Sequence, residues 1–243
     1  MALAGASILT TMIWAQSTPK TSRFDVAAIR SSDPTIPGAR MNISPGGTLT
    51  VVNQPLRKLI TYAYDVRNFQ LVGGPGWMDT DGYDITAKAP DNEPASRDAG
   101  GREKIRSLLS DRFGLVVHRE AKMQNVYRMV IAKRGARMRA VEKVGTQRGI
   151  YSGERGHIQG FAATTEMLSR ELAGITGRTV IDNTNLSAMY DWTLQWTTEA
   201  DDDTTAGPTL FTALQEQLGL KLEPAKAPVD MIVIDHVSRP TDN

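Results

Sequence analysis

Apolar residues recur with a helical period in two well-separated stretches of the chain. In residues 55–64 they stand at i, i+3, i+4 and i+7, which predicts an amphipathic helix that begins just after Pro55. Residues 164–177 show the same spacing, and Gly177 stands where a helix typically ends. The periodic residues are Leu56, Leu59, Ile60 and Ala63 in the first stretch, and Met167, Leu168, Leu172 and Ile175 in the second.

The segments after these two helices also resemble one another. A short apolar stretch, 69–72 or 179–182, is followed by a Tyr-Asp pair that opens an alternating stretch, at Tyr83 and at Tyr190. Such alternation predicts half-buried strands. A further amphipathic helix then stops at Gly114 or Gly219, and each is followed by two stretches with strand composition.

This order of elements predicts an α+β protein with two similar lobes from an internal duplication. Each lobe is expected to have the order β-α-β-β followed by α-β-β, with a mostly antiparallel sheet and helices on one face. The first strands are expected at 46–52 and 156–162. The predicted boundaries are a first lobe at 24–135, a basic linker at 136–155 and a second lobe at 156–243.

The N-terminus is apolar and uncharged through Ser17, although it lacks the basic residues that usually open a signal peptide. Small residues allow cleavage after Ala15 or Ser17, so residues 1–17 are interpreted as a signal peptide, with a buried N-terminal helix as the alternative. No later stretch is long and apolar enough to span a membrane, so we expect an extracytoplasmic protein without stable membrane insertion. The chain has no cysteine, which excludes disulfides and thiol catalysis.

Charge and motif content exclude several functions. The net charge of +1 argues against nucleic-acid binding. The histidines His118, His157 and His236 lack the spacing of metal ligands, and the first and last of them are expected near strand ends in different lobes. The acidic run 201–203 lacks the glycine and the glutamate of a calcium loop, and no nucleophile or phosphate-loop motif is present. We therefore expect no metal and no cofactor.

One loop differs between the two halves and is the candidate binding site. It consists of Gly73, Gly74, Pro75, Gly76 and Trp77, while the second half has Asn-Thr-Asn-Leu at that place. The glycines allow a close approach of a partner, and tryptophan is common among interface hot spots. The alternative is a tight connection in which Trp77 covers the core. Because the tyrosines of the Tyr-Asp pairs occur in both halves, they are interpreted as packing residues.

Several phrases resemble a known family. Residues 24–34, 53–90, 108–120, 177–196 and 209–243 are similar to the soil-associated family of exported bacterial proteins, a domain of unknown function expanded in acidobacteria. Some members of that family are attached to BlaR-like membrane metallopeptidases, which implies a sensing or binding role outside the cytoplasm. This chain has no His-Glu-x-x-His motif, so the resemblance implies no peptidase activity.

Two functions follow from these observations. The first is a non-catalytic extracytoplasmic binding or sensing module, with an envelope protein or a glycan as its partner. The alternative is a secreted hydrolase that acts on cell-envelope or extracellular polymers, because paired carboxylates cannot be assigned by sequence in a chain with 27 acidic residues.

Overall fold

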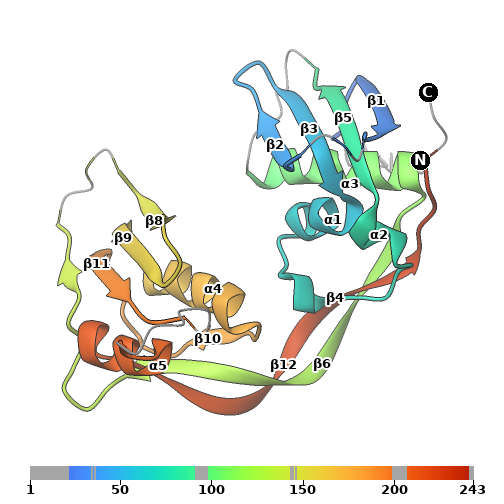
Figure 1. Cartoon of the computed structure of the whole chain (residues 1–243). Coiled ribbons are helices and arrows are strands. Elements are labelled where there is room, and N and C mark those ends of the chain that lie inside the picture. The colour runs from blue at the N-terminus through green and yellow to red at the C-terminus, as the bar shows by residue number, and fades with distance from the viewer. Residues whose placement is uncertain are drawn as a thin grey trace, which may run out of the picture.

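The computed structural model describes residues 22–240, except 34, 36, 91–97, 143–144, 146 and 199–206. These residues form an α+β structure with three four-stranded sheets. Two lobes stand at opposite ends of a long two-stranded ribbon (Figure 1). The expected signal peptide and the acidic run 201–203 lie outside the described residues.

The first lobe contains an antiparallel sheet with helices on one face (Figure 1). Its strand order is β1 (Val26–Ser31), β5 (Gly82–Lys88), β3 (Thr48–Pro55) and β2 (Arg40–Ile43). Helices α1 (Leu56–Tyr64) and α3 (Ala99–Phe113) bury their apolar sides in the same core as the sheet. Between α1 and β5 the chain forms a 3-10 turn η1 (Asn68–Gln70), β4 (Leu71–Val72) and α2 (Trp77–Thr80).

The second lobe has the same kind of sheet, in the order β7 (Arg139–Ala140), β11 (Tyr190–Gln195), β9 (His157–Ala163) and β8 (Gly149–Ser152). Its helices are α4 (Thr165–Thr176) and the short α5 (Leu210–Ala213), which continues as a π-helical turn η2 (Leu214–Leu218). A short strand, β10 (Val180–Asp182), follows α4. Strands β7 and β8 fall within residues 136–155, where the sequence indicates a linker without periodicity.

The ribbon consists of β6 (Val116–Ile131) and β12 (Leu220–His236), which pair antiparallel along their whole length. Strand β10 pairs parallel with β6 at one end, and β4 pairs parallel with β12 at the other. The expectation of two strands after each glycine is therefore wrong, because each half contributes one continuous strand instead.

Two prolines lie within the continuous strand of the second half. Pro224 and Pro228 are both in β12, although proline is usually confined to strand edges and ends. Pro224 pairs with Tyr127, whose N–H donates outward to the Thr179 carbonyl and not to β12. This is a pair without cross-strand hydrogen bonds, and Pro228, four residues further on, occupies the same kind of position. Neither proline removes a hydrogen bond from the ribbon.

The ribbon makes each core depend on both halves of the chain. Ile232 of β12 is fully buried in the first-lobe core, in a cluster that also contains residues of α1 and α3. Met129 of β6 is fully buried in the second-lobe core, together with Leu220. The two strands exchange lobes along their length, so neither core is built from one continuous segment.

The Tyr-Asp pairs make the same local arrangement in both lobes. Tyr83 on β5 and Tyr190 on β11 are buried, with exposed fractions of 1% and 8%. Asp84 Oδ1 accepts the N–H of Asn53 at 3.0 Å, and Asp191 Oδ1 accepts the N–H of Ala162 at 2.9 Å. Asn53 and Ala162 have φ of 48° and 43°, and both lie where the strand register shifts. The aspartate thus stabilises a bulge in the neighbouring strand.

These hydrogen bonds lower the pKa of both carboxyl groups. For Asp84 the Ser32 hydroxyl, at 2.6 Å, contributes most, followed by the Asn53 N–H and then Arg30. For Asp191 the Ala162 N–H contributes most to the lower pKa, followed by Arg139. A carboxyl whose folded pKa is depressed stabilises the fold above its unfolded pKa, and this stabilisation is lost as the pH falls through the folded pKa.

We expect Asp84→Ala to lower the free energy of unfolding by about 1–3 kcal/mol at neutral pH, because the bulge loses its acceptor. The deficit relative to wild type should shrink as the pH falls below the unfolded carboxyl pKa. Urea denaturation at a series of pH values measures this. Asp25→Ala, at an exposed aspartate beside the same sheet, is the control. A deficit that does not change with pH would contradict the role given to the Asp84 carboxylate.

A candidate ligand groove between the two lobes

Residues 65–70 bring the two lobes together. Helix α1 ends at Tyr64, and Asp65 adopts the left-handed conformation with φ 53°, which aspartate tolerates better than most residues. In the second lobe α4 continues to Thr176 before Gly177 takes that conformation. The interval from helix start to short strand is 15 residues in both lobes. Helix α1 is therefore shorter than α4, and the first lobe uses the remaining residues of the interval to form η1 and the loop before it.

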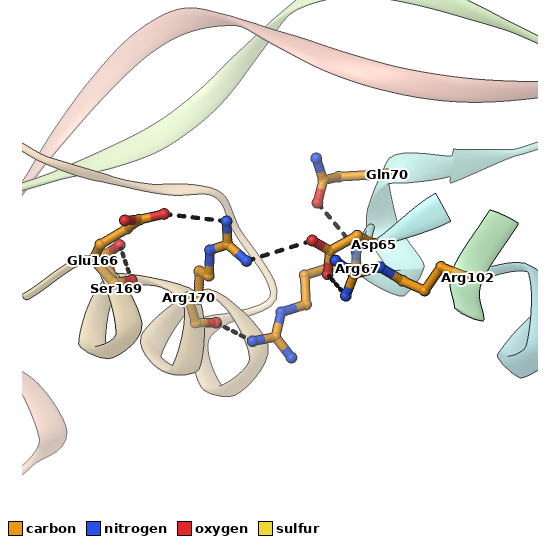
Figure 2. A network of polar contacts seen from close by, with 7 residues as sticks. All are labelled: Asp65, Arg67, Gln70, Arg102, Glu166, Ser169 and Arg170. Atoms are coloured by element: carbon orange, nitrogen blue, oxygen red, sulfur yellow. Dashed lines mark hydrogen bonds and ion pairs between the residues drawn. The ribbon is translucent and has the colours of Figure 1, made fainter. Parts of the chain in front are cut away.

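This segment contacts the second lobe through side chains (Figure 2). The Arg67 guanidinium donates to the carbonyl of Arg170 on α4. The Phe69 ring packs against the second-lobe core. Gln70 accepts the Arg67 N–H at 3.0 Å through Oε1, and its Nε2 donates to the Asp230 carbonyl of the ribbon at 3.2 Å. One short segment of the first lobe therefore reaches both the second lobe and the ribbon.

Charged side chains from three helical regions meet at this contact (Figure 2). Asp65 lies between two guanidinium groups, at 3.5 Å from Arg170 and 3.6 Å from Arg102 of α3. Arg170 also pairs with Glu166 one turn earlier, at 3.1 Å. Together with Arg67, which binds the Arg170 carbonyl, the cluster contains three guanidinium groups and two carboxylates. The cluster carries an excess of positive charge.

A groove of about 480 Å³ opens beside this cluster. Its lining comes from both lobes and consists of Thr61, Tyr62, Asp65, Val66, Arg67, Phe69, Gln70, Arg102, Arg170, Ala173, Thr179 and Val180. A second hollow of about 480 Å³ shares Thr61, Val66, Arg67 and Phe69 with it and extends to Lys58. The volume is within the range of small-molecule sites, which often lie between domains.

The groove was not predicted from the sequence, because its charged residues come from separate segments with no motif. No local signal marks the difference in length between α1 and α4, because Val66 continues the apolar period of the first helix at the position that corresponds to Ile175.

The loop predicted as a binding site lies elsewhere in the first lobe. Gly73 and Gly74 have φ of 82° and 85°, so the loop needs glycine for its backbone course. A Cβ on Gly74 would also meet Met78 and Ile234, so packing within the lobe needs a small residue there. The four residues 73–76 are exposed, and the groove lining includes none of them.

Trp77 is partly buried against the first-lobe core. Its ring meets Tyr83 edge to face at a centroid distance of 6.4 Å. The Arg239 guanidinium lies 5.0 Å from the ring centroid on another side and also pairs with Asp81 at 2.9 Å. These contacts support the alternative in which Trp77 covers the core, while a role of the loop in partner contact is still a prediction.

The histidines are placed differently from the expectation. His118 and His236 lie at the same end of the ribbon, because β12 crosses back to the first lobe. His118 Nδ1 lies 2.8 Å from Asp235 Oδ1, and both side chains are well exposed. Nε2 of His157, in the second lobe, is buried without a hydrogen-bond partner among the described residues. Within the described part of the chain no group of three or more His, Asp or Glu side chains is arranged to hold a metal ion.

We expect Trp77→Ala to lower the free energy of unfolding by about 2 kcal/mol or more, because it removes the ring that covers Tyr83. Urea denaturation measures the loss. Tyr151→Ala, at an aromatic residue whose exposed fraction is 48%, is the comparison and should cost less. If Trp77→Ala left the stability unchanged, Trp77 would not cover the core, and the loop would instead be a candidate contact surface.

Comparison with known proteins gives one match to a family model. A family model described as "Protein of unknown function (DUF3738)" matches residues 57–237. No curated protein and no solved structure gives a match. Among the described residues, none of the helices has the length and apolar character needed to cross a membrane.

Proposed function

Because the chain belongs to the DUF3738 family of proteins of unknown function, we propose its role from its own geometry: a non-catalytic binding or sensing module whose ligand lies in the inter-lobe groove. One observation carries this proposal. The groove is lined by α1, α3 and residues 65–70 of the first lobe and by α4 and β10 of the second. A ligand there touches both lobes, so its binding changes how firmly they hold together.

The structure of the contact supports such a response. The groove-side contacts between the lobes are a few polar bonds of Arg67 and Arg170 and the packing of Phe69. On the ribbon between the lobes, Gln124 and Asn125 are exposed, whereas Val126 and Val229 are buried in a small apolar cluster. Exposed ion pairs contribute little to stability, commonly about 0–1 kcal/mol. A ligand that bridges the lobes can therefore change the groove-side contacts at small cost, and a shift between two such states is how a sensor transmits binding.

A hydrolase that uses paired carboxylates needs two such groups facing the ligand. Of the described residues that line the groove, Asp65 alone is a carboxylate. Another hollow, of about 430 Å³, has Glu142 and Asp191 in its lining. The Ala162 N–H and Arg139 hold the pKa of Asp191 below its usual value, which is the wrong direction for a general acid. These features favour binding over the hydrolase alternative.

We also propose that the two lobes arose by internal duplication. The equal intervals between helix and short strand, and the matching arrangements of Asp84 and Asp191, support this origin. Gly114 and Gly219 add to the support, because both adopt positive φ at the ends of corresponding helices. In a duplicated chain, function is most readily carried by the part that has diverged, and residues 65–70 are such a part.

The binding function is tested by thermal melting of the protein against a panel of amino acids, peptidoglycan fragments and acidic saccharides. At least one compound should raise the melting temperature, since a ligand that binds the folded state stabilises it. Thr179→Trp, which fills the groove from β10's side, should abolish that shift. Thr193→Trp, at an exposed position of β11, is the control and should keep it. A Thr179→Trp protein that responds like wild type, or a panel without any response, would contradict the proposal.

Export is the second part of the proposal, and it rests on the apolar N-terminus and on the resemblance to exported proteins. Mass spectrometry of the protein from its native host should show a mature form that begins between Gln16 and Thr18. Intact Met1 on protein recovered from the cytoplasm would exclude it.

A further inference from the structure

We infer that the ligand of the groove carries an oxyanion, a carboxylate or a phosphate, which binds between Arg102 and Arg170 and displaces Asp65 from them. This inference rests on the proposed function, because it names the chemistry of the same site. It adds a role for Asp65, whose carboxylate occupies the place that the ligand's anionic group takes.

The lengths of the Asp65 ion pairs are the first support. Nitrogen to oxygen distances of strong pairs between arginine and carboxylate are about 2.7–2.9 Å. The shortest distances from Asp65 are 3.5 Å to Arg170 and 3.6 Å to Arg102. The Arg102 side chain makes no hydrogen bond among the described residues, and it is 27% exposed. A better-placed oxyanion can therefore gain hydrogen bonds that Asp65 does not make.

The balance of charge is the second support. Arg67, Arg102 and Arg170 line the groove, whereas Asp65 is the one carboxylate in its described lining. Glu166 compensates Arg170 from outside that lining, and its side chain is 70% exposed. Guanidinium groups match carboxylate and phosphate geometry through paired N–H donors. The unbalanced charge in a partly enclosed groove favours an anionic ligand over a neutral one.

The apolar part of the groove lining indicates the chemistry of the rest of the ligand. Phe69, Ala173 and Val180 offer apolar surface beside the charged cluster. The Arg67 guanidinium is oriented by the Arg170 carbonyl, so it is fixed at the border between the apolar and the charged parts. The site therefore fits a small molecule, or the end group of a saccharide or peptide, with one anionic group on a compact body.

Calorimetric titration at low ionic strength tests this with three probes: D-glucuronate, inorganic phosphate and neutral D-glucose. We expect saturable binding of at least one anionic probe, with a Kd of about 1 mM or lower, and none of glucose. Whichever of the two anions binds more tightly identifies the source of the oxyanion. Added salt should weaken the binding, since the site is partly exposed.

Two substitutions in the cluster have opposite expected effects. Arg102→Gln should weaken anion binding at least 10-fold, because it removes a charged donor. Asp65→Asn should strengthen it about 3-fold or more, because the competing charge is gone, and asparagine tolerates the left-handed conformation as well. The matched controls are Arg23→Gln and Asp111→Asn, from an ion pair that also measures 3.6 Å but lies outside the groove. Neither control should change the affinity.

The two proposals fail in different ways. Weaker or unchanged anion binding in Asp65→Asn, or tight binding of glucose, would overturn the oxyanion inference even if Thr179→Trp still blocks the groove. Ligand binding that persists in Thr179→Trp would contradict the proposal that the ligand binds in the groove. Absence of saturable binding by both anionic probes would also overturn the inference.

Discussion

The pairing of β6 with β12 is the interaction on which the rest of the structure depends. These two strands join the lobes, supply buried residues to both cores and provide the edges on which β4 and β10 pair. Neither half of the chain can complete its core without the other. The ribbon also brings α4 opposite residues 65–70, because each of these segments leads into a short strand that is bound to the ribbon.

Much of the fold follows from local patterns. Helices α1 and α4, the strands before them and the two Tyr-Asp strands lie where periodicity and the flanking glycine and proline indicate. The reason is that each buries an apolar face within its own lobe, so burial and sequence period agree. The Tyr-Asp pair is informative in a second way: the tyrosine enters the core, and the aspartate binds the bulge of the neighbouring strand.

The long strands and the groove could not be predicted in the same way. The second ribbon strand contains Pro224 and Pro228, which are unfavourable inside a strand unless they stand at positions without a cross-strand hydrogen bond. The groove depends on side chains from segments that meet only through the crossing of the ribbon. The loop 73–77 is predicted as a site because it differs between the two halves, yet Gly73 and Gly74 are explained by backbone conformation and by packing against β12.

The central claim is that a ligand binds across the lobes at residues 65–70 and α4. Hydrogen–deuterium exchange with and without D-glucuronate tests it most directly, because it reports on every segment at once. The account predicts slower exchange in both of these segments together, on opposite sides of the groove, with little change in residues 73–77. Protection confined to residues 73–77, or to one lobe alone, would contradict it.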